Sequence, residues 1–360
     1  MLLFFEKKSI FASMSRTITY LILISLLFSS GCGRNANNYF KLTGYTQGTT
    51  YNITYCDRDT LGNKIHFTPD DIQFFISESL TNIDNTISGY NKGSILSKIN
   101  NNIDCDLNPI FEEIFNISQD IHKLTDGFVD ISGGPLFDLW GFGFKAGIDP
   151  CEEDINSAMT LIGMDKIKIV GNKVVKDTPS TQLNFNAIAP GYSCDLIGRL
   201  LENKGITDYL IEIGGEVLCK GNNPNRKDWT IGIDTPTDGN NDSGKDIKAI
   251  ISVSDIAVVT SGNYRKYYIK DGKKYSHSIN PKTGRPVSHN LLSATILAKT
   301  AALADGYATY CMVIGLEESI KFFDSHPEIE GYLIYGEQEN MKVFCTPKLE
   351  KTIRQKQKFL

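Results

Sequence analysis

Helix signals and hairpin signals alternate along this chain without the regular strand–helix–strand repeat of a parallel sheet. The segment Thr68–Asp71 (Thr-Pro-Asp-Asp) is typical of a helix start, because a capping hydroxyl, a proline and two acids suit a first turn. The helix is predicted to run to Ile87. Asp271-Gly272, between two segments rich in tyrosine, isoleucine and lysine, predicts a tight hairpin. This mixture predicts an α+β fold rather than a doubly wound parallel sheet.

The other elements follow from periodicity and from glycine or proline breaks. Further helices are predicted at 109–124, 191–203 and 316–323, and a hairpin at 167–176 through Gly171-Asn172. Strands are predicted at 48–55, 209–213, 229–233, 247–253, 264–269, 273–279, 291–298, 331–334 and 342–345. No internal repeat and no linker composition appears after residue 40, so we expect one domain over residues 40–350.

The N-terminal segment has the features of an export signal. Lys7, Lys8 and Arg16 precede an apolar run over residues 20–28, and small residues then lead to Cys32. This pattern is typical of a bacterial lipoprotein signal, in which the cysteine is lipidated and becomes the mature N-terminus. We therefore predict a signal peptide over 1–31 and a lipidated cysteine with a polar tether over 32–39. A plain signal peptide and a short membrane span are the alternatives, although the run is short for a span.

Charge and cysteine content exclude some classes of function. The net charge is −5 and no basic cluster with interleaved aromatics is present, so nucleic acid is not an expected partner. Seven of the eight cysteines remain if one is lipidated, and none forms a Cys-x-x-Cys pair, which argues against zinc. Cys194, Cys219 and Cys311 lie in apolar contexts and are predicted to be core thiols.

Asp305 and Thr309 stand four residues apart in an apolar segment that ends before Gly315. On a helix this spacing puts both side chains on one face. A carboxylate and a hydroxyl are the kind of oxygen ligands that Mg²⁺ accepts. Taken alone, the pair is more often explained by the helix dipole and by a partly buried face. Its neighbours in the sequence strengthen the metal hypothesis.

Four other stretches combine glycine, proline and polar residues beside apolar strands: 130–143, 184–192, 213–217 and 260–286. Glycines allow backbone N–H groups to approach a ligand, and a loop that enters a helix can bind an anion. His277, at a predicted strand end beside a proline-rich turn, is placed for acid–base chemistry. Each stretch also has a purely structural explanation as a tight loop, a helix entry or a bulge. No P-loop, Gly-x-Ser-x-Gly or His-Glu-x-x-His motif is present.

In this order the stretches resemble the ApbE-type FAD:protein FMN transferases, over roughly residues 40 to 346. The segments that carry the resemblance are Gly48–Tyr51, Ser132–Gly143, Ala187–Ala189 with Gly191 and Tyr192, Ile213–Glu216, Thr260–Tyr264, His277–Pro286, and Ala304-Asp305 with Ala308-Thr309.

The resemblance implies a two-lobed, T-fold-related α+β architecture with mixed or antiparallel sheets, flanking helices and FAD in a cleft between the lobes. It implies Mg²⁺ held by Asp305, Thr309 and the backbone carbonyl of Ala187. His277 matches the histidine that assists deprotonation of the acceptor. The positions that match the family's flavin contacts are Gln47, Tyr90, Phe128, Val129, Asp130, Asn184, Pro190 and Ile279.

Several of these positions depart from the family pattern. Gln47 stands where methionine is frequent, and Pro190 stands where lysine, glutamine or glutamate is frequent. Asn280 and Glu212 each replace an aspartate. Asn184 also replaces a common aspartate and so removes one negative charge near the implied metal.

The implied reaction is Mg²⁺-dependent transfer of FMN from FAD to a threonine of an exported or membrane protein, with release of AMP. The expected acceptor is a flavoprotein subunit with an Asp-Gly-x-Thr-type motif, and the expected location is a bacterial membrane, facing the periplasm through a lipid anchor. Two alternatives stay open: a pyrophosphatase that splits FAD into FMN and AMP, and a non-catalytic flavin-binding lipoprotein. The chain itself carries Ala308 where such a motif would need its threonine, so self-modification is not expected.

Overall fold

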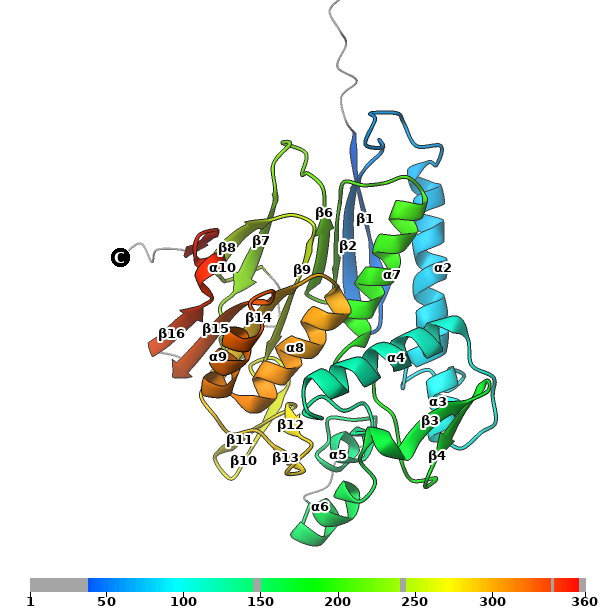
Figure 1. Ribbon diagram of the computed structural model, residues 1–360, viewed down its shortest axis with the longest axis vertical. Helices are drawn as coiled ribbons and strands as arrows, with labels where there is room; N and C mark the ends of the chain where they lie inside the picture. The colour runs from blue at the N-terminus through cyan, green and yellow to red at the C-terminus, as the bar shows by residue number, and fades with distance from the viewer. Residues whose placement is uncertain (1–37, 145–149, 240–243, 338–339, 356–360) are drawn as a thin grey trace, which may run out of the picture. The chain divides into compact units, whose positions relative to one another are not determined.

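The computed structural model describes residues 38–144, 150–239, 244–337 and 340–355, which belong to one compact unit (Figure 1). The strands of its main sheet are β1 (Tyr39–Thr46), β2 (Thr49–Cys56), β5 (Tyr209–Ile213), β6 (Glu216–Lys220), β9 (Ile256–Gly262), β14 (Leu291–Ala298), β15 (Glu330–Glu337) and β16 (Asn340–Cys345). They pair in the order β1-β2-β5-β6-β9-β14-β15-β16, and every neighbouring pair is antiparallel.

Helices cover one face of this sheet. The helices of the described residues are α2 (Pro69–Ile87), α3 (Ile95–Asn100), α4 (Pro109–Leu124), α5 (Gly134–Leu139), α6 (Glu152–Met159), α7 (Ala189–Asn203), α8 (Ala301–Ile314), α9 (Leu316–Ser325) and α10 (Pro347–Glu350), with a 3-10 turn η1 (Met164–Lys166). Among them, α10 packs on β15 from the other face, and α5 packs with α6. Figure 1 shows α7 and α8 side by side, where α7 packs on β5 and β6 and α8 packs on β9 and β14. α2 lies against α7, and α4 contacts both α2 and α8.

A second, three-stranded sheet covers part of the opposite face. It contains β7 (Trp229–Asp234), β8 (Ile247–Val253) and β17 (Ile353–Gln355), in the order β17-β8-β7. Three small hairpins complete the fold: β3 (Ile167–Val170) with β4 (Lys173–Lys176), β10 (Tyr267–Lys270) with β11 (Lys273–Ser276), and β12 (Ile279–Asn280) with β13 (Arg285–Pro286). The last two lie at the lower end of the sheet, near α5, in Figure 1.

The alternation of side chains along the strands explains why the sheet is covered on both faces. In β9, Val259 packs into the core under the helices, whereas its neighbour Val258 packs into the core under β7 and β8. Successive residues of a strand point to opposite faces, so both faces of this strand are apolar. All eight residues of β14 are buried, as expected for a central strand with a covered sheet on each side.

The predicted α+β class, with antiparallel sheets and flanking helices, is confirmed. α2, α4 and the β3–β4 hairpin have the predicted bounds, and α7 begins two residues before the predicted start. The predicted strand 264–269 starts three residues before β10 and ends one residue before the end of β10, and the predicted strand 273–279 runs three residues past the end of β11. Beyond Ser276 the chain leaves the hairpin, because Ile279 pairs with Pro286 in a separate turn.

The cysteines agree with the predicted core thiols. Cys194, Cys219 and Cys311 are buried, and all seven cysteines of the described residues are free thiols. Burial raises the pKa of Cys311 to about 12, so this thiol stays protonated. The predicted signal peptide, Cys32 and most of the tether lie outside the described residues. No helix within the described ranges has the length and apolar character required to cross a membrane.

Candidate active site

Asp305 lies where the beginnings of two helices meet. It belongs to the second turn of α8, and its Oδ2 accepts a hydrogen bond of 3.1 Å from the backbone N–H of Gly191 in the first turn of α7. The side chain of Ile188, which precedes α7, provides no cap. A carboxylate is well suited to this place, because the N-terminal N–H groups of a helix carry partial positive charge.

The charge of Asp305 is costly in this environment. The residue is only 4% exposed, and burial together with the nearby Glu216 carboxylate raises the pKa of Asp305 well above its ordinary value. Burial, with the Glu212 carboxylate adding to it, raises the pKa of Glu216 to about 7. A cation between or beside these two carboxyl groups would stabilise their ionised forms.

Three oxygen atoms on Asp305 and on the segments that adjoin it are of the kind that binds a hard divalent cation. Asp305 Oδ1, Thr309 Oγ1 and the carbonyl of Ala187 take part in no hydrogen bond within the part of the chain described. Thr309 follows Asp305 by one helical turn, and Ala187 lies four residues before the N–H that Asp305 accepts. No group of three or more histidine, cysteine or acidic side chains that could hold a metal occurs among residues 38–355 outside the gaps. A metal here would therefore rest on one carboxylate and neutral oxygens.

Two tight turns of the main sheet lie next to α7. Gln47 and Gly48 connect β1 to β2 with φ of 51° and 74°, the two positive values of a type I′ hairpin. The Gln47 Nε2 atom donates to Ser193 Oγ in α7 at 2.5 Å. The Gly214-Gly215 turn between β5 and β6 contacts the same hairpin through the bond from Gly214 N–H to the Thr50 carbonyl at 3.0 Å. The predicted flavin contact Gln47 is thus joined to the helix that Asp305 caps.

The loop after α4 carries three predicted flavin contacts, Phe128, Val129 and Asp130, and packs against α8 through Phe128. The Phe128 ring lies 6.0 Å from that of Tyr310, one residue after Thr309, and Val129 is buried. Asp130 Oδ1 accepts hydrogen bonds from the N–H and hydroxyl of Ser132, at 2.8 and 2.5 Å, which fixes its carboxylate. His122, in the last turn of α4, has its Nδ1 3.5 Å from Asp130 Oδ2.

Asn184 joins this loop to the entry of α7. The residue is 4% exposed, and its side-chain Oδ1 accepts a hydrogen bond from the backbone N–H of Asn186 at 2.9 Å. The backbone N–H of Asn184 donates to the Ile131 carbonyl at 2.7 Å. Pro190 occupies the second position of α7, where a missing N–H costs nothing. Asp130, Asn184, Ala187 and Pro190 are therefore on connected pieces of backbone.

His277 lies directly after β11 and is held by the residue before β10. Its backbone N–H donates to the Lys266 carbonyl at 3.1 Å, and its Nδ1 lies 3.1 Å from the same oxygen. A carbonyl only accepts, so Nδ1 carries the proton and Nε2 keeps its lone pair. Burial lowers the pKa of His277 to about 4. The imidazole is therefore neutral at pH 7.

Aromatic side chains fix the hairpin that carries His277. Phe142 stacks on Tyr268 at 5.3 Å and Trp140 stacks on Tyr275 at 5.7 Å, and the Phe142 and His277 rings are 6.4 Å apart. Trp140 Nε1 also donates to the Gly284 carbonyl at 2.8 Å. The glycine-rich loop 130–143 is thus attached both to the hairpin and to the β12–β13 turn.

The last two predicted flavin contacts differ from each other. Ile279 is buried beside Trp140, and its strand β12 packs on α8, so it belongs to the cluster. Tyr90 is 74% exposed, and its ring contact is with Phe144 at 5.1 Å. In the part of the chain described, Tyr90 contacts no other predicted site residue through its ring.

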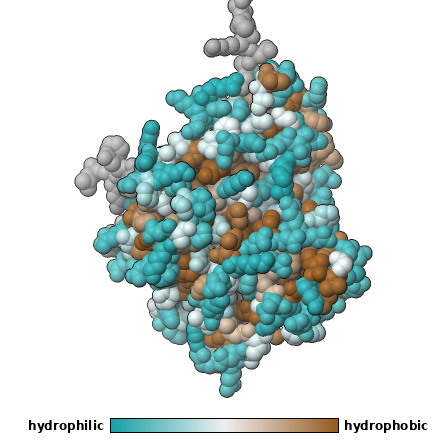
Figure 2. Space-filling view, viewed as in Figure 1, coloured by the Kyte–Doolittle hydropathy of each residue, from teal (hydrophilic) through white to brown (hydrophobic). Residues whose placement is uncertain are grey.

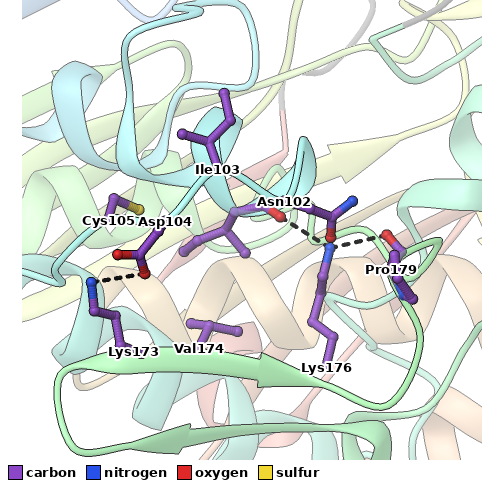
Figure 3. Close-up of a pocket in the computed structure, with 9 residues that line it drawn as sticks. Asn102, Ile103, Asp104, Cys105, Lys173, Val174, Lys176 and Pro179 are labelled. Carbon is purple, nitrogen blue, oxygen red and sulfur yellow. Dashed lines mark hydrogen bonds and ion pairs between the residues drawn. The ribbon is translucent and has the colours of Figure 1, made fainter.

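A surface cavity between α3 and β4 contains none of the predicted site residues (Figure 3). Lys176 Nζ there donates to the carbonyls of Ile99, Pro179 and Thr181, and Lys173 is paired with Asp104. The amines of Lys176 and Lys173 are therefore bound to groups of the protein itself. A second cavity, between α2 and the β1–β2 turn, reaches Gln47.

Sequence reasoning did not select three charged side chains near the site. Glu216 ends the segment Ile213–Glu216, in which the sequence pattern predicts no role for its side chain, and Arg265 pairs with Asp234 at 3.0 Å beside the Gly214-Gly215 turn. Asp195 is buried in α7, and burial raises its pKa to about 6. An acid within the apolar stretch 192–198 was the available signal for Asp195, because an unpaired carboxylate is rarely buried.

Known proteins resemble the chain over most of its length. The family model described as the ApbE family matches residues 47–333. A protein of Vibrio cholerae named FAD:protein FMN transferase is 35% identical over 329 residues, covering 90% of this chain and 95% of its own length. The protein of the same name from Escherichia coli is 31% identical over 345 residues, covering 91% and 95%.

Solved structures agree with this assignment. The flavin transferase ApbE from Vibrio cholerae superposes with a TM-score of 0.76 at 31% identity, over 88% of this chain and 99% of that one. The flavinyl transferase ApbE of Pseudomonas stutzeri gives a TM-score of 0.76 at 28% identity, over 88% and 97%. Because the family model matches residues 47–333 and the relatives share the fold over most of the chain, the chain belongs to the ApbE family.

Proposed function

We propose that this protein transfers FMN from FAD to a threonine of another protein and releases AMP. The observation that carries the proposal is the junction of α7 and α8, where a buried Asp305, a helix N-terminus and unbonded oxygens converge. A site of this kind is suited to phosphoryl chemistry, which needs charge neutralisation and alignment more than covalent help. The relatives in the same family carry this activity in their names.

Asp305, Thr309 and the carbonyl of Ala187 would hold Mg²⁺. When bound, the ion would neutralise charge on the pyrophosphate of FAD. Three oxygens with no hydrogen bond in the described chain support this assignment. The raised pKa of Asp305 supports it further, because a cation favours the ionised carboxylate that burial disfavours.

His277 would accept the proton of the attacking threonine. As the threonine oxygen bonds to the phosphorus on the FMN side, its proton passes to Nε2 of the imidazole. The bond from that phosphorus to the AMP oxygen breaks, and AMP leaves with the electron pair. The Lys266 carbonyl holds the required tautomer, and the lowered pKa keeps the ring neutral, although it also makes His277 a weak base.

The flavin and adenine parts of FAD would lie along the connected loops around α7 and α8. The residues assigned to contact FAD are Gln47, Tyr90, Phe128, Val129, Asp130, Asn184, Pro190 and Ile279. Gln47 is attached to α7 by a hydrogen bond, the loop with Phe128 to α8 by a ring contact, and Asn184 to that loop by a backbone hydrogen bond to Ile131, which would preorganise the site.

The acceptor would be an exported or membrane protein with an Asp-Gly-x-Thr-type motif. A lipid on Cys32 would hold the enzyme at the membrane, facing the periplasm. The apolar run before Cys32 and the polar residues after it support this part of the proposal.

The deciding experiment mixes the protein with FAD, MgCl₂ and an acceptor protein that carries the motif. The matched control is the same acceptor with its threonine changed to valine. We expect a fluorescent flavin band on a denaturing gel for the threonine acceptor alone, with AMP in equal amount. Free FMN and AMP without a labelled acceptor would identify a pyrophosphatase, and no AMP at all would identify a flavin-binding protein.

A further inference from the structure

The first turn of each of α7 and α8 is capped by a carboxylate from the second turn of the other helix. Asp305, from α8, accepts the N–H of Gly191 in α7. In return Asp195, from α7, accepts the N–H groups that begin α8: Ala301 donates to its Oδ1 at 2.8 Å and Ala302 to its Oδ2 at 2.9 Å. Each helix therefore supplies a buried carboxylate to the N-terminus of the other.

The exchange satisfies both helix starts. In α8, Asp195 takes the first two N–H groups, and the hydroxyl of Thr300 accepts the third, from Leu303, at 3.4 Å. In α7, the N–H of Ala189 donates to the Phe185 carbonyl at 2.8 Å, Pro190 has no N–H, and Gly191 is bound to Asp305. An N-terminal N–H group buried without a partner is costly, so both carboxylates are required for this packing.

The two helix starts are also in direct contact. A Cβ on Gly191 would overlap the carbonyl oxygen of Ala301, so the backbones of the two helix starts are already as close as a glycine allows. Asp195 itself is 8% exposed, and both of its oxygens are occupied by N–H groups. It is therefore a fixed connection from α7 to the beginning of α8, one turn before Asp305.

We infer that Asp195 is a positioning residue for the metal site: by holding the start of α8 on α7, it sets the carboxylate of Asp305 relative to the carbonyl of Ala187. The inference rests on the proposed function, because it assumes a metal at Asp305. Substitution of a residue that orients a metal ligand without touching the metal typically lowers metal affinity by about 10- to 100-fold.

The test compares the wild type with Asp195→Asn, which keeps the volume and removes the charge and one acceptor. Glu330→Gln is the matched control. Glu330 is 5% exposed and accepts the N–H of Leu349 at 3.2 Å at the start of α10, so it is also a buried carboxylate that caps a helix. It lies on β15, and no proposed site residue contacts it in the described ranges.

Two quantities are measured on all three proteins at saturating FAD. One is the MgCl₂ concentration that gives half-maximal FMN transfer. The other is the increase in Tm that MgCl₂ causes without acceptor. For Asp195→Asn we expect the half-maximal MgCl₂ concentration to rise about 10-fold or more, with kcat near wild type at saturating MgCl₂. Glu330→Gln should lower Tm and leave the MgCl₂ dependence unchanged.

Equal MgCl₂ dependence in Asp195→Asn and wild type would overturn the inference, as would an equal shift in Glu330→Gln. A wild type that does not respond to MgCl₂ would instead reject the metal part of the proposed function and the inference with it. If Asp195→Asn does not fold, Asp195→Ser, which keeps one acceptor, is measured in its place with the same expectations.

Discussion

At the scale of single residues, the site concentrates ionisable groups away from their ordinary pKa values. Burial raises the pKa values of Asp305 and Glu216, with the Glu216 carboxylate adding to the first and the Glu212 carboxylate to the second, whereas burial lowers the pKa of His277. Each group is thus neutral over a wider pH range than it would be in water. Perturbed groups of this kind gather at functional sites, and Glu216 lies near enough to Asp305 for its charge to raise the pKa of Asp305.

Asp305→Asn should abolish the stabilisation by MgCl₂ and most FMN transfer, without unfolding the protein. The amide oxygen can still accept the N–H of Gly191, so the cap of α7 survives. The pKa of Asp305 is raised in the fold, so its contribution to stability is present at low pH and is lost as pH rises. Without metal, the variant should therefore lose less stability than wild type between pH 5 and 8.

Melting curves in EDTA and in MgCl₂ across that pH range test this expectation. Full transfer activity of the variant after EDTA treatment would refute the assignment of the metal to Asp305.

His277→Gln should slow transfer by about 10²- to 10⁴-fold and leave the Kd for FAD nearly unchanged, because general-base assistance acts on the acceptor and not on FAD. The pKa of His277 is depressed, so the neutral ring stabilises the fold at pH 7. That contribution is lost as pH falls from about 6.5 toward about 4. NMR of histidine-labelled protein should therefore show a ring that does not titrate between pH 6 and 8.

A signal that titrates near 6.5 would contradict the burial of His277. A variant with weakened FAD binding and normal turnover at saturating FAD would reassign the residue to support of the β12–β13 turn.

At the scale of elements, prediction succeeded where local signals act alone. α2 has a capping threonine, a proline and two acids, and its bounds were predicted correctly. α5, α6 and β9 were not predicted, although α6 begins with a capping box and three acids in its first turn, which are local signals. β9 lies between β6 and β14, which gives it a partner on each edge that no local pattern reveals.

The loop after α5 offers a test of how elements support the site. Trp140→Phe removes the bond from Nε1 to the Gly284 carbonyl, which costs about 0.5–1.5 kcal/mol, and part of the stack on Tyr275. We expect lower stability and weaker FAD binding, because Ile279 and the β12–β13 turn lose this support.

Trp229→Phe is the matched control. Trp229 is equally buried, and its Nε1 donates to the Lys220 carbonyl at 2.9 Å under the second sheet. Chemical denaturation should give a similar loss of stability in both variants, with FAD affinity reduced only in Trp140→Phe. Equal FAD affinity in the two would show that the loop is not part of the binding site.

At the scale of the whole molecule, the sequence placed most of the site residues on segments that the fold brings together. The segments that carry Asp305, Thr309 and Ala187 come together because α7 and α8 pack side by side, although Gly191 and Asp305, which are hydrogen-bonded, are 114 positions apart in the sequence. The reciprocal capping through Asp195 could not be predicted, since it requires knowing that two helix starts touch. Figure 2 shows a face covered mostly by hydrophilic residues, with hydrophobic ones in scattered groups, and no single patch on it marks the acceptor's position.

The proposed membrane attachment depends on a part of the chain outside the described residues and is tested with the whole chain. Cys32→Ser should move the protein from the membrane fraction to the soluble fraction or leave its precursor unprocessed, because the lipid would have no thiol to join. Cys151→Ser is the matched control, since Cys151 is an exposed thiol of the folded unit. It should change neither fractionation nor processing. Both variants should transfer FMN to a soluble acceptor at the wild-type rate, because the α7–α8 junction lies in the compact unit from Asn38 onward. Unchanged membrane attachment of Cys32→Ser would mean that the apolar run itself is the anchor.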